Sequence, residues 1–261
     1  MDKKISVVIN TYNASSHLED VLNSVIEFDQ IVVCDMESTD DTLEIVAKFA
    51  STGKCKIVHF PKGNHKICEP ARDFAIHSAD YKWVLVVDAD EIVPDALRKY
   101  LYARINEPGF DDAIALARQN LFMGRPATAS PDYQLRFFQK EKACWPPIIH
   151  ARPHVDCRII EIPANRKDLY LRHLDNPSIA ERISKMNNYT DYEVIKREKR
   201  PYGTFRFLFR PLWFFLRSYL LGKGFLDGKR GLIRAYMAMI YQATYMAKIT
   251  EKRLNKSDVK D

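Results

Sequence analysis

The chain has 261 residues, of which 46% are hydrophobic and 28% are charged, and its formal net charge is +6. This length and apolar content suit one large α/β domain, or a domain with an appendage, and exclude a disordered chain. The modest positive charge fits phosphate-bearing partners such as nucleotides, nucleic acids or anionic lipids, but it fits ordinary solubility equally well.

The N-terminal segment and the cysteines both indicate a cytoplasmic chain. The opening MDKKISVVINTYN has only a short apolar run, so no secretory signal is expected and the chain should start near Met1. No uncharged apolar stretch approaches the length of about 18 residues that a membrane span needs. The five cysteines lack CxxC spacing, which argues against a zinc ribbon and a disulfide framework.

The first hundred residues alternate between apolar runs of strand length and segments with helical spacing. Ser16 and Glu19 are spaced as a capping box for the first helix, and Ser38 or Thr39 is expected to cap the second. Strands are predicted at residues 5–9, 30–35, 56–60 and 82–88, and the helices between them at about 15–26, 38–50 and 69–79.

These strands are almost continuously apolar, which is typical of a parallel sheet covered by helices on both faces. The carboxyl ends of parallel strands lie along one edge, where open α/β sheets bind their ligands. Asn10, Asp35 and Asp88 each stand at such an end. The sequence therefore predicts a ligand site along this edge.

The regular alternation fades between about residues 95 and 175. A helix is expected in PDALRKYLYARI, and strands are expected in AIALARQNLF and DYQLRFFQ. After residue 177 the patterns are helical to the end of the chain. We therefore predict an α/β catalytic domain at residues 1–176 and a C-terminal helical appendage at residues 177–261.

The stretch WVLVVDADE changes from a buried strand to a cluster of carboxylates at Asp88. Asp88 and Asp90 are closely spaced oxygen ligands of the kind that Mg²⁺ or Mn²⁺ prefers, and such a metal would neutralise a leaving diphosphate. An isolated pair of this kind more often opens a solvent loop or caps a helix. Here the preceding strand, together with Asp35 at the same edge, favours the metal site.

Several segments resemble family-2 glycosyltransferases of the GT-A fold. SVVINTYNASSHLEDVLNSV looks like the opening of that family, IVVCDMESTDDTLEIV like its second strand and acidic turn, and VVDADE like its DxD motif. PDYQLRFFQK and LFRPLWFFLRSYLLGKGFLDGKRGLI are similar to the branch with lipopolysaccharide core glycosyltransferases. The resemblance implies a mostly parallel Rossmann-like sheet, with a nucleotide-binding half at 1–95 and an acceptor-side half at 96–176.

The same resemblance implies roles for individual residues. Plain turn or solvated positions remain the alternative for Asn10, Tyr12 and Arg72. Met36 stands where relatives often carry a second acid, so their base preference does not transfer to this chain. Asn10, Thr11 and Tyr12 are implied to contact the nucleotide, Asp35 to contact the base or ribose, and Arg72 to lie near the phosphates. Asp88 is implied to face the ribose and the metal shell, and Asp90 to be the metal ligand.

The catalytic base is left open by the sequence. Relatives in this branch often have an acid where the chain has Ala151 in IIHAR. Asp132 and His150 are the candidates, because a carboxylate or an imidazole can accept the proton of an acceptor hydroxyl, and Asp132 ranks first. A surface aspartate and a structural histidine are the alternatives. His173 follows an expected strand and is left outside the predicted metal ligands.

The aromatic basic segment TFRFLFRPLWFFLRSYLL is expected to be amphipathic. Arg206, Arg210 and Arg217 lie around an apolar face, and Pro211 is expected to kink the helix or divide it. Such a segment suits contact with an anionic membrane, and packing against the catalytic domain is the alternative. The predicted face consists of Phe205, Leu208, Phe209, Leu212, Trp213, Leu216, Tyr219 and Leu220.

The resemblance implies a metal-dependent, inverting glycosyltransferase at the inner face of a bacterial cell membrane. It would transfer a sugar from a nucleotide-diphosphate sugar to a hydroxyl of a glycan or lipid-linked glycan, in lipopolysaccharide or other envelope biosynthesis. A nucleotidyltransferase is one alternative, although NTYNASS lacks the glycine-rich phosphate loop it would need. A non-catalytic protein that binds anionic membrane or nucleic acid is another, but nucleic acid is not an expected partner.

Overall fold

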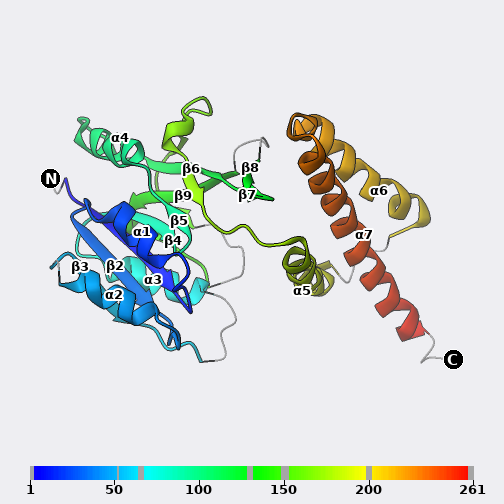
Figure 1. The fold of residues 1–261 in the computed structure, drawn as a ribbon, viewed down its shortest axis with the longest axis horizontal. Helices are drawn as coiled ribbons and strands as arrows, with labels where there is room; N and C mark the ends of the chain where they lie inside the picture. Colours follow the sequence, from blue (N-terminus) through cyan, green and yellow to red (C-terminus); the bar gives the residue numbers. More distant parts are fainter. Residues whose placement is uncertain are drawn as a thin grey trace. The chain divides into compact units, whose positions relative to one another are not determined.

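The computed structural model consists of two compact units, each described here by itself (Figure 1). Unit 1 contains Met1–Gln119 and Pro131–Leu174, and unit 2 contains Asn120–Ser130 and Asp175–Asp261. The residues that the structure describes are 3–51, 53–63, 68–127, 132–147, 153–197 and 202–257.

Unit 1 is built on a sheet that has nine strands in the described part of the chain, in the order β3-β2-β1-β4-β9-β6-β13-β5, with β12 beside β6. The first four are parallel, and β9 lies antiparallel between β4 and β6. The predicted mostly parallel α/β sheet is therefore confirmed. The strands are β1 (Ile5–Thr11), β2 (Gln30–Asp35), β3 (Cys55–His59), β4 (Trp83–Asp88), β5 (Glu91–Ile92), β6 (Ala113–Gln119), β9 (Asp132–Gln139), β12 (Ile159–Glu161) and β13 (Leu171–His173), and a separate pair consists of β10 (Ala143–Cys144) and β11 (His154–Val155).

Both faces of this sheet are covered, which explains why its strands are apolar without alternation. Val7 packs into a core that contains Leu18 and Leu97, whereas its neighbour Val8 packs into a second core that contains Ala71. Successive side chains of a strand point to opposite faces, so both must be apolar. The helices are α1 (Leu18–Val25), α2 (Thr42–Ala50), α3 (Glu69–His77) and α4 (Asp95–Asn106), with short 3₁₀ turns η1 (Lys140–Lys142) and η2 (Lys167–Leu169).

The predicted helix caps are wrong. His17 is the N-cap of α1 and Asp41 that of α2, and neither makes a side-chain cap hydrogen bond. Ser38 instead belongs to the loop after β2, where its hydroxyl donates to Asp35 Oδ1 at 2.6 Å and its oxygen accepts from the backbone N–H of Asn13 at 3.0 Å, and α2 begins only at Thr42. The capping box of Ser16 with Glu19 fails because the helix begins two residues after Ser16.

Unit 2 is helical except for a small hairpin. The long helix α7 packs against both α5 and α6, around a core of Val194, Tyr245, Met246 and Ile249. Helix α6 continues through Pro211 and is followed by a π-helical turn, so the proline does not divide it. The elements are β7 (Leu121–Phe122), β8 (Arg125–Pro126), α5 (Ile179–Arg197), α6 (Thr204–Leu216), η3 (Arg217–Leu221), η4 (Gly224–Asp227) and α7 (Lys229–Ser257).

Among the described helices, none combines the length and the apolar character needed to cross a bilayer.

Two glycines allow η4 to approach the first turn of α7 closely. A Cβ atom added to Gly231 would lie 1.8 Å from the carbonyl oxygen of Gly224 and 2.6 Å from its carbonyl carbon. Gly224 is itself buried, and a Cβ there would lie 2.9 Å from the carbonyl oxygen of Ser218. The backbones of the two segments therefore touch at a place where no other residue fits.

Gly231→Ala should destabilise the protein, because the added methyl group collides with backbone atoms that cannot rotate away. We expect the free energy of unfolding to fall by about 1–3 kcal/mol, the usual cost of overpacking. The measurement is chemical denaturation followed by circular dichroism. Gly203→Ala is the matched control, because no atom lies within 4 Å of a Cβ at that position. Equal stability of the two variants would contradict the prediction.

Candidate active site

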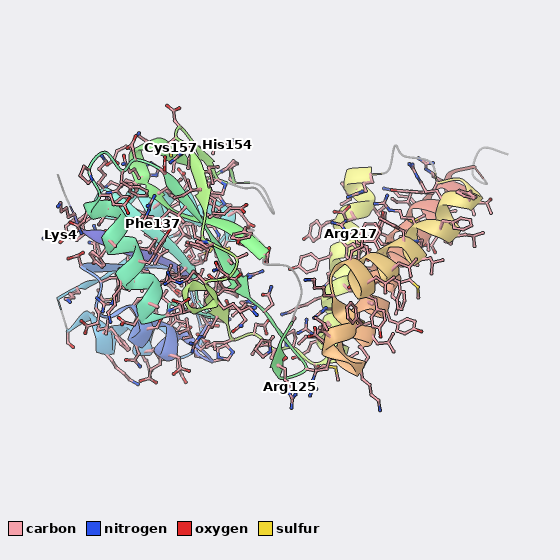
Figure 2. All side chains as sticks on the ribbon, turned by 90° about the horizontal axis from the view of Figure 1, so that it is seen from above. Lys4, Arg125, Phe137, His154, Cys157 and Arg217 are labelled. Atoms are coloured by element: carbon pink, nitrogen blue, oxygen red, sulfur yellow. The ribbon has the colours of Figure 1, made fainter. Side chains whose placement is uncertain are left out.

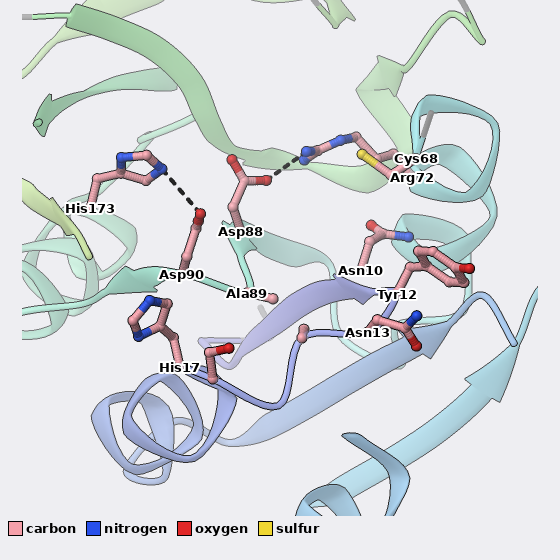
Figure 3. A pocket seen from close by; sticks show the side chains of 12 residues that line it. Asn10, Tyr12, Asn13, His17, Cys68, Arg72, Asp88, Ala89, Asp90 and His173 are labelled. Atoms are coloured by element: carbon pink, nitrogen blue, oxygen red, sulfur yellow. Dashed lines mark hydrogen bonds and ion pairs between the residues drawn. The ribbon is translucent and has the colours of Figure 1, made fainter. Parts of the chain in front are cut away.

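A pocket of about 390 Å³ opens at the carboxyl edge of the sheet in unit 1. The pairing of β1 with β4 places Asn10 beside Asp88, so the ends of two neighbouring strands supply its floor. Figure 3 shows how side chains from these strand ends, from α3 and from β13 converge on it. It is lined by Asn10, Tyr12, Asn13, Ala14, Ser16, His17, Cys68, Arg72, Asp88, Ala89, Asp90 and His173.

Asp88 is held between two arginines that come from opposite sides of it. Arg72 Nη2 on α3 donates to Asp88 Oδ1 at 2.5 Å, and Arg136 Nη2 on β9 pairs with Asp88 Oδ2. Burial alone would raise the pKa of Asp88, but the charges of Arg136 and Arg72 outweigh it and lower that pKa below its usual value. The carboxylate is therefore ionised and fixed in place.

Glu91 lies fully buried behind Asp88 and supports it. Its Oε2 accepts a hydrogen bond of 3.0 Å from the backbone N–H of Asp88, and its Oε1 lies 3.4 Å from Arg136 Nη2 and 3.5 Å from Arg118 Nη1. Burial raises the pKa of Glu91 despite the opposing charge of Arg136, and the charge of Asp88 raises it further. Glu91 thus fixes the backbone where β4 leaves the sheet.

Asp90 faces His173 rather than an arginine. His173 Nε2 lies 3.2 Å from Asp90 Oδ2, and the backbone carbonyl of Asp90 accepts a hydrogen bond from Leu174 N at 2.7 Å. Burial alone would lower the pKa of His173, but the hydrogen bond and charge of Asp90 raise it overall.

Asn10 and Tyr12 both line the pocket as predicted residues of the nucleotide site. The side-chain oxygen and nitrogen of Asn10 are buried, and neither has a hydrogen-bond partner among the described residues. Leaving such atoms unpaired costs about 1–3 kcal/mol each, so the amide is prepared for a polar ligand. The ring of Tyr12 is 44% exposed, and Lys62 Nζ lies 3.6 Å from its centroid.

Thr11 and Asp35 lie next to the pocket and do not line it. Asp35 is fully buried, and its carboxylate accepts hydrogen bonds from Thr11 Oγ1 at 3.0 Å and from the backbone N–H and hydroxyl of Ser38. In this arrangement Asp35 holds the loop after β2 against the end of β1. Its predicted contact with the base or ribose stays a prediction.

Asp132 lies away from the pocket lining, at the start of β9. It accepts a hydrogen bond of 3.0 Å from Arg118 Nη2, and that guanidinium also faces Glu91. The second candidate base, His150, and the neighbouring Ala151 fall outside the described residues. The structure therefore connects Asp132 to the Asp88 network through Arg118 and leaves the identity of the base as a prediction.

Arg136 is a site residue that the sequence did not single out. It stands between Leu135 and Phe137 in DYQLRFFQ, and its side chain is 3% exposed. An arginine in the middle of an apolar strand needs a buried carboxylate, and this was the signal available in the sequence. Which carboxylate it meets depends on the pairing of β9 with β4, where Leu85 lies opposite Phe137.

The donor atoms at the pocket fit a divalent metal. Asp90 supplies a carboxylate oxygen and His173 an imidazole nitrogen, a mixed set that suits Mn²⁺ and is less typical of Mg²⁺. Both oxygens of Asp88 are already paired with guanidinium groups, so it is the weaker of the two predicted ligands. Among the lining residues, the donor atoms of Asp90 and His173 therefore fit such an ion best.

Comparisons with known proteins agree with this architecture. Residues 6–167 match the family model described as glycosyl transferase family 2. An uncharacterized glycosyltransferase of Rickettsia typhi is 25% identical over 98% of this chain and 90% of its own length. The lipopolysaccharide core biosynthesis glycosyltransferase LpsC of Rhizobium meliloti is 23% identical over 97% of this chain and 94% of its own. The mannosyltransferase PcManGT from Pyrobaculum calidifontis, in complex with GDP-Man and Mn²⁺, has a TM-score of 0.50 and 17% identity over 95% of this chain and 75% of its own.

Arg136→Met should be strongly destabilising, because it leaves Asp88 and Glu91 buried without their shared counter-charge. We expect the free energy of unfolding at pH 7 to fall by about 3–5 kcal/mol in urea denaturation. Arg98→Met is the matched control and should have a much smaller effect, because its ion pair with Asp95 lies at the surface.

The deficit of Arg136→Met should also depend on pH. Arg136 lowers the folded-state pKa of Asp88, so its contribution is complete above the unfolded carboxyl pKa of about 4 and is lost as pH falls. The difference between wild type and variant should therefore shrink below about pH 4. A difference that stays constant from pH 7 to pH 3 would contradict the assigned role of Arg136.

Proposed function

We propose that the chain, which belongs to glycosyl transferase family 2, transfers a sugar from a nucleotide-diphosphate sugar to a hydroxyl of a glycan or lipid-linked glycan. The predicted family and GT-A fold are confirmed by the family match and the structural likeness. The observation that carries the proposal is the pocket itself, in which the unpaired amide of Asn10 lies beside Asp88, Asp90 and Arg72. The pocket thus combines polar groups that can hydrogen-bond a ligand with carboxylates that can bind a cation.

The donor would lie along the edge formed by residues 1–95, the proposed nucleotide-binding half. Asn10 offers a donor and an acceptor for the nucleotide, and the exposed ring of Tyr12 offers a stacking surface. Arg72 Nη1 is buried and has no hydrogen-bond partner among the described residues, which suits a diphosphate oxygen. Thr11 and Asp35 would support this edge from behind.

A divalent metal, Mn²⁺ or Mg²⁺, would be held by Asp90 and His173, with Asp88 as a neighbouring carboxylate. When bound, such an ion supplies positive charge that stabilises the leaving diphosphate. The mannosyltransferase with a similar fold is in complex with GDP-Man and Mn²⁺, which supports a nucleotide sugar and a metal for this chain. In this structure His173 Nε2 lies 3.2 Å from Asp90 Oδ2, so both donor atoms already face one place, and a bound ion would replace their mutual contact.

The transfer is proposed to invert the sugar's configuration. In that reaction a base takes the proton of the acceptor hydroxyl while the nucleoside diphosphate leaves from the opposite face. Asp132, in the acceptor-side half at residues 96–176, is the proposed base, with His150 as the alternative. Its hydrogen bond with Arg118 keeps the Asp132 carboxylate oriented in the absence of substrate.

The proposed setting is the inner face of the cell membrane, in the biosynthesis of lipopolysaccharide or another envelope polysaccharide. The relative named for lipopolysaccharide core biosynthesis supports the pathway class. Unit 2 supports membrane contact, because seven of the eight residues of the predicted apolar face on α6 and η3 are exposed. They are Phe205, Leu208, Phe209, Leu212, Trp213, Leu216 and Leu220, with Trp213 at 54%.

A panel of nucleotide sugars tests the transferase proposal. Incubation with Mn²⁺ or Mg²⁺ should release a nucleoside diphosphate from one donor, slowly even without acceptor, and Asp90→Asn should reduce the rate by at least about tenfold. Asp20→Asn is the matched control, because Asp20 is an exposed aspartate on α1 that does not line the pocket. Absence of donor hydrolysis with either metal, or an unchanged Asp90→Asn rate, would refute the proposal and favour the non-catalytic alternative.

Flotation with phosphatidylglycerol-containing liposomes tests the membrane proposal. The double variant Leu212→Glu/Trp213→Glu should float markedly less than wild type, because each change places a charge on the proposed membrane face. Ile195→Glu is the matched control, since Ile195 is an exposed apolar residue on α5. Wild type that stays unbound, or equal loss in both variants, would count against membrane contact through α6.

A further inference from the structure

A second pocket, of about 160 Å³, lies within unit 2 and is rich in arginine. The hairpin β7–β8 contributes Arg125, and the first turns of α7 contribute Arg230 and Arg234. Asp227 is the one carboxylate among its lining residues. Three guanidinium groups against one carboxylate give this pocket a net positive charge that the glycosyl-transfer site does not use.

Arg234 carries part of this charge on buried atoms. Its Nη1 lies 2.8 Å from Asp227 Oδ2, and the side chain is 18% exposed. Its Nη2 is buried and has no hydrogen-bond partner among the described residues. A buried N–H group of this kind is stabilised by an anion that enters the pocket and accepts its hydrogen bond.

The pocket is a built feature of the fold, since several contacts fix its walls. Arg230 Nε donates to the carbonyl oxygen of Met123 at 3.1 Å, which ties α7 to the hairpin turn. That turn places Met123 and Gly124 at positive φ, as a two-residue hairpin of this type requires. On the other side, the close approach at Gly231 holds η4 against α7. Arg125 extends from the hairpin and is exposed (Figure 2).

The volume and the chemistry of the pocket select a phosphate group. Pockets for drug-sized ligands occupy about 300–1,000 Å³, so this one suits a single small group and excludes a nucleotide sugar. Guanidinium groups bind phosphate through paired, charge-assisted hydrogen bonds. The pocket also lies at the N-terminal end of α7, a helix of 29 residues, whose dipole favours an anion at that end.

Apolar residues at the same end of unit 2 indicate what carries the phosphate. Leu226 lines the pocket and is 61% exposed. Phe225, next to it in the chain, and Leu221, five residues earlier, are exposed as well. Exposed apolar side chains next to an anion site fit a molecule with a phosphate head and an acyl chain. We propose that this pocket binds the phosphate group of a lipid. This inference rests on the proposed membrane contact and deepens it by naming the group that is recognised.

Calorimetry with monomeric dihexanoyl phosphatidic acid tests the pocket without requiring a membrane. Wild type should bind this short-chain lipid more tightly than inorganic phosphate, because only the lipid has acyl chains that can cover the exposed side chain of Leu226. Arg125→Glu should weaken lipid binding by at least about tenfold, the loss expected for one charge-assisted contact. Arg230→Gln should also weaken binding, and thermal denaturation of this variant checks that the hairpin contact of Arg230 is not needed for folding.

Arg206→Glu is the matched control, since it makes the same charge change on an exposed arginine of unit 2. Arg210, four residues after Arg206 on α6, hydrogen-bonds Gln242 on α7, and Gln242 is twelve residues after Arg230. This part of α6, with Arg206, therefore lies roughly 20 Å along α7 from the pocket. Equal weakening by Arg206→Glu and Arg125→Glu would overturn the proposal in favour of diffuse electrostatic attraction. Binding of inorganic phosphate as tight as that of the lipid would overturn the lipid assignment.

The outcome is separable from those of the other proposals. If wild type floats with liposomes and Arg125→Glu binds the short-chain lipid normally, the pocket proposal fails while membrane contact stands. If the short-chain lipid binds and wild type does not float, the membrane proposal fails while the pocket stands. Donor hydrolysis by Arg125→Glu should equal that of wild type, because Arg125 does not line the pocket of unit 1.

Discussion

The placement of Asp88 between Arg72 and Arg136 is the interaction on which the site depends. It joins three elements that are far apart in sequence, α3, the end of β4 and the middle of β9, at one carboxylate. Burial of a single charge would be prohibitive, but the two guanidinium groups make the ionised form of Asp88 the stable one. Because Glu91 holds the backbone N–H of Asp88, the same network determines where Ala89 and Asp90 leave the sheet. The position of Asp90 next to His173 follows from this constraint.

The sequence predicts the local parts of this arrangement and leaves the long-range part undetermined. The strands with Asn10, Asp35 and Asp88 at or next to their ends follow from apolar runs, since a parallel sheet covered on both faces tolerates few polar residues. The edge location of Asn10, Arg72, Asp88 and Asp90 then follows from topology. The partner of Arg136 cannot be predicted in this way, because packing between distant segments sets the antiparallel position of β9 next to β4. One such contact is the stacking of Trp83 on Phe137, whose ring centroids are 5.2 Å apart.

The errors at the helix caps have a related cause. Ser38 has the right spacing to cap a helix, but its hydroxyl donates to the buried carboxylate of Asp35 and its oxygen accepts from the backbone N–H of Asn13. The helix itself begins only at Thr42. The carboxylate of Asp35 in turn accepts hydrogen bonds from Thr11 and Ser38 and does not line the pocket, while its predicted contact with the base or ribose stays a prediction. Patterns identify which residues are polar and near each other, while competition among their hydrogen bonds decides which of them faces the pocket. On α6 the opposite holds, because the helical period alone fixes which side chains share a face.

The two pockets differ in charge balance, and the difference bears on how each would hold phosphate. In unit 1, Asp88 and Asp90 outnumber Arg72 among the charged lining residues, and Arg72 is already paired with Asp88. Asp88 is neutralised by Arg72 and Arg136, whereas Asp90 faces His173 instead of an arginine. A metal beside Asp90 and His173 would supply further positive charge for a diphosphate. In unit 2, three arginines face one aspartate, so a phosphate needs no added cation. A chelator should therefore abolish donor binding in the first pocket and leave lipid phosphate binding in the second unchanged.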